Sequence, residues 1–245
     1  MSLPDHVLLR AEWGGRVDPL ETQIAMIWDC MERLRSYGGF FTEPWLSLQA
    51  RLGHEKQVIG RDELAADMTR SCMGGEGPRY GFCQPGNIDG VDEPRVCVTL
   101  STSLSDDEGW ERMAANRAVL MVEPTKKKGV VAPVPVEWLL GIGQSLVKDF
   151  VDIWRPDAVS LDSSELLSLD AKPFSAFPTI GYFTWLSGSV VDPEVLPSAS
   201  VCESYEGGVL FGIDPVSSDP VGDASFLARQ VYGSGVLRLI PFVQG

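Results

Sequence analysis

The chain has 245 residues, 44% of them hydrophobic, and carries 34 acidic against 20 basic residues, a net charge of −14. A chain of this length can bury about 70–75% of the surface that its unfolded form exposes, so a sizeable core is available without disulfides. The acid excess disfavours direct binding to nucleic acids or to anionic membranes, because contacts to phosphate require lysine and arginine.

Two further features favour a cytoplasmic protein. The apolar run at 7–9 is too short for a signal peptide and is flanked by Asp5 and Glu12, and no window approaches the roughly 18 uncharged apolar residues of a membrane span. The cysteines are odd in number and irregular in spacing, which is typical of free thiols in a reducing compartment.

The first half of the chain predicts strands and two helices. Residues 7–13 alternate in hydrophobicity as a strand does. Asp18 as a cap and Pro19 in the first turn, followed by apolar residues at helical spacing up to Leu34, predict a helix that ends at Gly38. The same periodicities predict a helix at 61–72, a loop at 73–81, and strands at 95–103 and 117–123.

The second half opens with a basic tract at 126–128, predicted to form a turn, and a long amphipathic helix at 134–152. The remaining predicted elements are a strand at 158–161, a helix at 163–169, a strand at 179–186, a hairpin of 201–205 with 208–213, a helix at 224–232 and a strand at 236–240. This order predicts a single α+β domain over residues 1–245, with a mixed, mainly antiparallel sheet packed against helices. Two lobes, roughly 1–125 and 133–245, are an alternative arrangement.

Motifs of common catalytic and cofactor sites are missing from the sequence. The two histidines, His6 and His54, accompany no nucleophile motif, and surface histidines are the preferred interpretation. Cysteine and histidine do not cluster at zinc-binding spacings. The glycines of GIGQS at 141–145 lie inside a helical pattern and lack the third glycine of a dinucleotide loop. We therefore expect no catalytic residue, no metal and no cofactor.

Carboxylates leave one enzymatic alternative open. Residues 106–108 (Asp-Asp-Glu) and the pair Asp149 and Asp152 could bind Mg²⁺ or act as acid and base in a carboxylate-based hydrolase or metal-dependent enzyme. A helix face that carries two aspartates is more often simply solvated. A third alternative is an adaptor protein of a secretion system.

The acid excess is concentrated in one third of the chain. Residues 141–225 carry 13 acidic and 3 basic residues, which predicts a negatively charged face. Acidic residues beside the predicted strands are candidates for contact with a basic partner, although solubilising charge is the simpler interpretation of any one of them. These candidates are Asp192, Glu194, Glu203, Glu206, Asp214 and Asp219. Trp45, in an irregular segment after Pro44, is a candidate interface anchor, although a place in the core is preferred for it.

Three parts of the sequence together resemble the immunity protein 52 family. They are HVLLRAEWGGRVDPLETQIAMIWDCMERL at 6–34, IWRPDAVSL at 153–161, and PTIGYFTWLSG at 178–188 followed by GGVLFGI at 207–213. The resemblance implies an α+β domain without enzymatic activity that serves as the antidote of a bacterial polymorphic toxin. Such toxins commonly carry a restriction-endonuclease-like nuclease domain and are often delivered by type VI secretion. The family implies no catalytic residues and does not indicate which residues touch the toxin.

Residues and resemblance together predict a cytoplasmic immunity protein that neutralises a cognate nuclease-type toxin by direct protein–protein contact. A nuclease must present a basic groove to phosphate, and an acidic partner is steered toward such a groove. The sequence is compatible with a monomer and with a homodimer.

Overall fold

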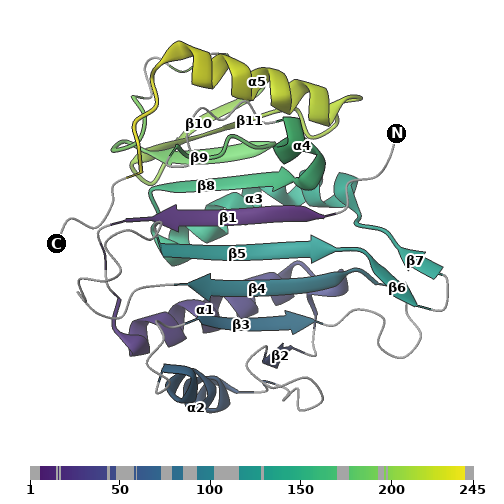
Figure 1. The fold of residues 1–245 in the computed structure, drawn as a ribbon, viewed down its shortest axis with the longest axis vertical. Helices are drawn as coiled ribbons and strands as arrows, with labels where there is room; N and C mark the ends of the chain where they lie inside the picture. Colours follow the sequence, from purple (N-terminus) through teal and green to yellow (C-terminus); the bar gives the residue numbers. More distant parts are fainter. Residues whose placement is uncertain are drawn as a thin grey trace.

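The computed structural model is built around one large antiparallel sheet (Figure 1). The residues that the structure describes are 6–14, 16, 18–42, 45–47, 58, 60–72, 79–84, 93–101, 116–127, 130–169, 177–192, 196 and 198–240.

Nine strands form this sheet in the order β10-β11-β9-β8-β1-β5-β4-β3-β2, and every neighbouring pair is antiparallel. In chain order they are β1 (Val7–Trp13), β2 (Leu46–Ser47), β3 (Arg79–Gln84), β4 (Arg95–Ser101), β5 (Asn116–Glu123), β8 (Ala158–Ser163), β9 (Phe183–Ser187), β10 (Val201–Tyr205) and β11 (Gly208–Gly212). A separate hairpin consists of β6 (Thr125–Lys127) and β7 (Val130–Ala132). The predicted α+β class is confirmed, and the central strand β1 joins strands from both halves of the chain.

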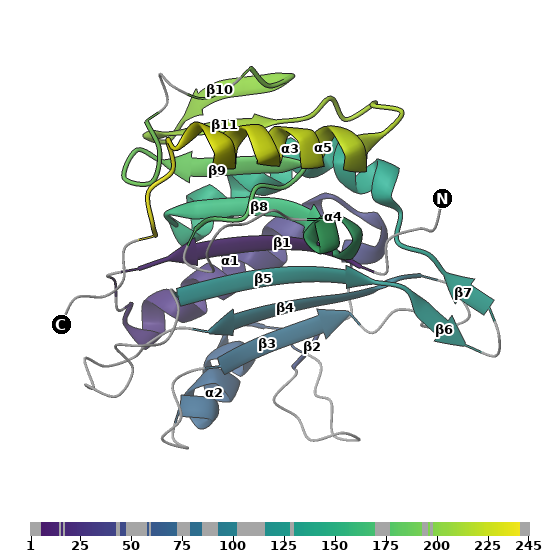
Figure 2. The same ribbon diagram turned by 45° about the horizontal axis from the view of Figure 1, so that its top comes forward.

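Helices lie on both faces of the sheet (Figures 1 and 2). They are α1 (Leu20–Ser36), α2 (Arg61–Cys72), α3 (Val136–Trp154), α4 (Ser164–Leu169) and α5 (Pro220–Ser234), with a 3-10 turn at Gly39–Phe41. Helices α1 and α3 cover one face, and α2 packs beside α1 and β3. Helices α4 and α5 lie on the opposite face, near β8 and β9, so no described helix covers β1, β5 and β4 on that side.

The core forms where α3 crosses the sheet. Leu9 of β1, Leu161 of β8 and Phe183 of β9 are consecutive cross-strand neighbours, and all three are buried. Gly143 of α3 lies directly above them, since a Cβ atom at this position would stand 2.7 Å from both Leu161 and Phe183. The GIGQS glycines therefore lie in a helix, as predicted, and Gly143 allows close helix–sheet contact there.

Several local predictions differ from the structure. The cap predicted at Asp18 is wrong, because Pro19 precedes α1 without a capping hydrogen bond and the Asp18 carboxylate pairs with Arg16 instead. Residues 79–81, predicted as loop, begin β3, because pairing with β4 outweighs a local glycine-rich pattern. Lys126 lies in β6 and not in a turn. Residues 236–240 form no strand and make one isolated bridge, Leu237 to Val191.

Within the part of the chain that the structure describes, no helix combines the length and the apolarity that crossing a membrane requires.

Candidate interaction surface

Two helices that are distant in sequence, α1 and α3, meet around Arg33 of α1. The Arg33 Nη1 atom lies 2.7 Å from Asp149 Oδ1 and 3.1 Å from Asp152 Oδ2, both on α3, and Arg33 Nε lies 3.3 Å from Asp29 Oδ2 on α1. Burial alone would lower the pKa of Arg33, but the hydrogen bonds to Asp149 and Asp152 outweigh it and raise the pKa. One guanidinium therefore holds α1 and α3 together through two carboxylates of α3, and a third carboxylate, on α1 itself, pairs with the same side chain.

Two tyrosines donate hydrogen bonds to the same aspartates of α3. The Tyr37 hydroxyl donates to Asp149 Oδ2 at 2.6 Å, and the Tyr205 hydroxyl of β10 donates to Asp152 Oδ1 at 2.6 Å. Burial and these hydrogen bonds raise the pKa of both phenols above the ordinary value, so both stay protonated and act as donors. The Tyr205 contact extends the network from the helices to the outermost strand of the sheet.

A second cross-link joins α3 to β10. Lys148 Nζ lies 2.8 Å from Glu203 Oε1, and Gln144 also donates to this carboxylate. The hydrogen bond from Lys148 holds the pKa of Glu203 below its ordinary value. The Lys148 ammonium also lies 5.2 Å from the ring centre of Tyr205, within the range of a cation–π contact.

These contacts define one continuous acidic surface on α1, α3 and β10. Five acidic side chains and two basic ones share it, a net charge of −3 from −5 and +2: Asp29, Asp149, Asp152, Glu203, Glu206, Arg33 and Lys148. Glu206 follows Tyr205 in the exposed turn between β10 and β11 and is the acidic member closest to the end of the hairpin. The acidic surface can attract and orient a positively charged partner.

The structure brings together only two of the six predicted acidic contact residues, Glu203 and Glu206. Asp214 and Asp219 are exposed, and both accept hydrogen bonds from nearby backbone groups. Asp214 accepts from the N–H of Val216, and Asp219 caps α5 by accepting from the N–H of Gly222. Asp192 is exposed beyond the bridge at Val191. Glu194 lies outside the described residues.

Trp45 lies in the core and not on the surface. Its side chain is fully buried and packs edge to face on Phe82, with ring centres 5.0 Å apart. A partner cannot touch a tryptophan with an exposed fraction of 0%, so the candidate interface anchor is corrected to a core residue.

The aspartates of the enzymatic alternative have structural partners. Asp149 and Asp152 each accept from Arg33 and from a tyrosine, as described above. Residues 106–108 and His54 lie outside the described residues, while the backbone of His6 pairs with Ser164 at the start of α4. Among the described side chains, no three of histidine, cysteine, aspartate and glutamate gather as a metal-binding group.

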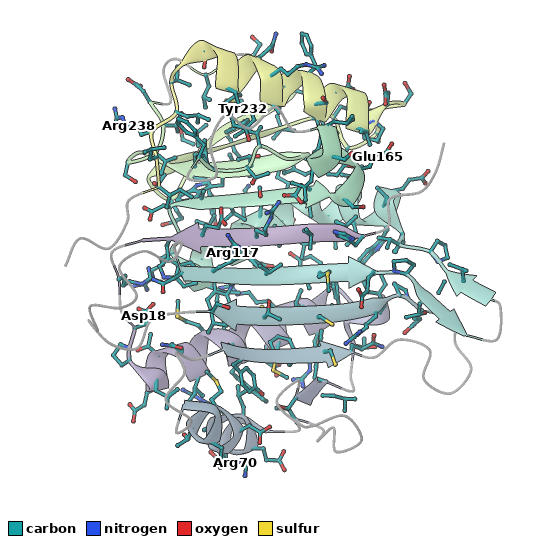
Figure 3. All side chains as sticks on the ribbon, viewed as in Figure 1. Asp18, Arg70, Arg117, Glu165, Tyr232 and Arg238 are labelled. Atoms are coloured by element: carbon teal, nitrogen blue, oxygen red, sulfur yellow. The ribbon has the colours of Figure 1, made fainter. Side chains whose placement is uncertain are left out.

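The sequence did not predict a buried ion pair that lies on the opposite face of the sheet. Asp162 of β8 is 0% exposed, and its Oδ2 atom lies 2.7 Å from Arg10 Nη2 of β1, while Oδ1 has no hydrogen-bond partner among the described residues. Beside it, Arg117 of β5 pairs with Glu12 at 2.7 Å, on the side of the sheet that faces the viewer in Figure 3. Burial raises the pKa of Asp162 to about 6, with Arg10 opposing the effect. The alternation of side chains along β1 places Arg10 and Glu12 on one face of the strand. It does not show that β8 lies beside β1, so the partner Asp162 could not be predicted.

Replacing Arg33 with glutamine tests the bridge between α1 and α3. We expect the free energy of unfolding to fall by roughly 1 kcal/mol, because the pairs are partly exposed and three carboxylates lose one cation. Chemical denaturation measures the loss. Arg70→Gln is the matched control, since Arg70 is 64% exposed and its one ion pair among the described residues lies within α2. Equal losses in both variants would contradict a bridging role for Arg33.

Comparisons with known proteins identify a protein of similar fold, but they do not assign the chain to a family. No family model matches the chain, and no curated protein matches it in sequence. Among solved structures, the T6SS protein PA0821 of Pseudomonas aeruginosa is similar, with a TM-score of 0.51 and 12% identity, over 99% of this chain and 81% of that one. At this identity the likeness shows a shared fold alone.

Proposed function

We propose that this chain is an immunity protein of a type VI secretion system that binds a cognate antibacterial toxin and neutralises it by direct contact. The observation that carries the proposal is the fold shared with a T6SS protein over 99% of the chain. The sequence segments that resemble the immunity protein 52 family point to the same biological setting and, more specifically, to a nuclease-type toxin.

The charge of the protein supports the choice of partner. A nuclease domain presents a basic groove to phosphate, and a chain of net charge −14 is attracted to such a groove. The acidic surface offers carboxylates whose positions are fixed by Arg33, Lys148 and two tyrosines. Fixed side chains lose little conformational entropy on binding, which favours affinity as well as steering.

Co-expression in bacteria tests the proposal. The toxin domain encoded beside the gene of this chain is expressed from an inducible promoter, alone and together with the chain. We expect growth to stop with the toxin alone and to be restored by the chain, and the two proteins to co-purify. Persistent killing in the presence of folded chain would refute the immunity function.

A further inference from the structure

Strand β10 is one of the two outermost strands of the sheet, and no described element pairs with its outer side. It pairs with β11 on one side only, and no described strand or helix lies beyond it in the view of Figure 2. Cys202 and Ser204, which point to the same face of the sheet, are both exposed. Native proteins protect such edges with charged side chains, proline or bulges. Strand β10 has no proline and no bulge, and its one charged side chain, Glu203, is held against α3 by Lys148 and Gln144. An edge with so little protection is a template for an added strand.

The turn at the end of the hairpin fixes which backbone groups point outward. Glu206 and Gly207 both have positive φ, 44° and 73°, as in a two-residue type I′ turn. In such a hairpin the flanking residues, Tyr205 and Gly208, exchange backbone hydrogen bonds, and alternate residues repeat the pattern. The N–H and C=O groups of Cys202 and Ser204 therefore point away from β11, toward the open side.

A pocket beside the end of β10 offers a place for one side chain of an added strand. Its volume is about 330 Å³, and the residues that line it include Leu186, Val191 and Val209 together with Ser204, Tyr205 and Glu206. Of these, Glu206 is exposed. A pocket that combines aliphatic residues with an exposed carboxylate suits the long aliphatic stem and the cationic head of lysine or arginine.

We infer that the toxin binds by adding an extended, basic segment to the open edge of β10, with a lysine or arginine in the pocket beside Glu206. The inference rests on the proposed function and names the surface through which it acts. Two acidic side chains and no basic one lie on β10 and its turn: Glu203 pairs with Lys148 of α3, and Glu206 has no ion-pair partner among the described residues. A second copy of this chain would bring the same acidic side chains and a net charge of −14 against this edge, so charge favours a basic partner over self-association.

Proline at Ser204 tests the added strand. Ser204→Pro removes the outward N–H, and an edge strand tolerates proline where its N–H faces solvent. Because one interface hydrogen bond is lost and the proline ring hinders the neighbouring strand, we expect affinity for the purified toxin domain to fall about tenfold or more. Ser204→Ala, which keeps the N–H, is the matched control and should bind within about threefold of the original chain.

Amide hydrogen exchange gives a second readout that does not depend on a substitution. In the free chain the amides of Cys202 and Ser204 should exchange rapidly, and toxin should protect both. Unchanged exchange, together with undiminished toxin binding by Ser204→Pro, would overturn strand addition while leaving the immunity function intact. If these amides were protected in the free chain, and more so at higher concentrations of the chain, the edge would be a site of self-association. That result would also overturn strand addition by the toxin. Failure of the original chain to bind the toxin would refute both proposals.

Discussion

Replacing Arg10 with methionine should lower the free energy of unfolding by about 3–5 kcal/mol at pH 8, the cost of leaving a buried carboxylate without its ion-pair partner. Asp162 is fully buried, and its only described partners are Arg10 and the hydroxyl of Ser160, which donates at 3.2 Å. Methionine retains much of the aliphatic stem of arginine, so the loss reports mainly on the charge. Urea denaturation followed by tryptophan fluorescence measures the effect.

Two variants separate this effect from a general response of the sheet. Arg95→Met removes an arginine on the same face, but its pair with Glu123 is partly exposed, at 43% and 29%, and should cost under about 1 kcal/mol. The double variant Arg10→Met with Asp162→Leu removes both charges and should recover most of the stability, since an apolar pair can replace a buried ion pair. A double variant as unstable as Arg10→Met alone would contradict the assignment.

The pH dependence of the same variant follows from the pKa of Asp162. Burial raises this pKa to about 6 in the folded chain, from an ordinary value of 3.8. The folded state therefore binds this proton more tightly than the unfolded state, and the ionised carboxylate opposes folding above pH 6. That penalty fades as the pH falls from 6 to 4. The destabilisation caused by Arg10→Met should accordingly be larger at pH 8 than at pH 5, and an equal or larger loss at pH 5 would contradict a buried unpaired charge as its cause.

Charge reversal at the hairpin turn should slow association with the toxin by about tenfold or more at low ionic strength, because steering by charge can change on-rates by 10- to 1,000-fold. Glu206→Lys is the cleaner single change, because Glu203 is also held by Lys148 and Gln144. The double variant Glu203→Lys with Glu206→Lys should have the larger effect and a weaker dependence of the on-rate on salt. Stopped-flow or surface-based kinetics across a salt series measures both quantities.

A charge reversal elsewhere serves as the control. Asp62 is exposed in the first turn of α2, beside β3, far from β10 in the sheet order (Figure 1). Asp62→Lys changes the net charge by the same amount as Glu206→Lys but leaves the acidic surface intact. On-rates that fall equally in the two variants would show that net charge alone matters, and would remove the acidic surface as the docking face.

Local periodicity predicted most elements of this fold, and long-range pairing decided the rest. The helix ending before Gly38 and the hairpin at 201–212 appear as predicted, because each depends on residues close in sequence. Strand β3 was missed because it follows directly on the glycine-rich sequence at 73–78 and its stability comes from pairing with β4. That β10 ends the sheet could not be predicted, since strand order depends on contacts between distant segments.

The candidate surface was predicted only in part, for a similar reason. Glu203 and Glu206 could be named because acidic residues beside strands are commonly exposed. Asp149 and Asp152 were considered as catalytic carboxylates, and their partners Arg33 and Tyr205 lie on α1 and β10, more than 50 residues away at the shortest separation. Charge counts find an acidic region, but the contacts that fix it come from the packing of α1 on α3 and of α3 beside β10.

Titration of the purified chain into the purified toxin domain, followed by calorimetry, tests the central proposal most directly. An immunity protein that acts by direct contact should give saturable binding at a fixed stoichiometry, with a dissociation constant of about 10⁻⁷ M or lower, as in specific protein–protein complexes. The affinity should also fall as salt is raised, since an acidic surface contributes to it. No binding by folded chain at micromolar concentrations of both proteins would contradict neutralisation by direct contact.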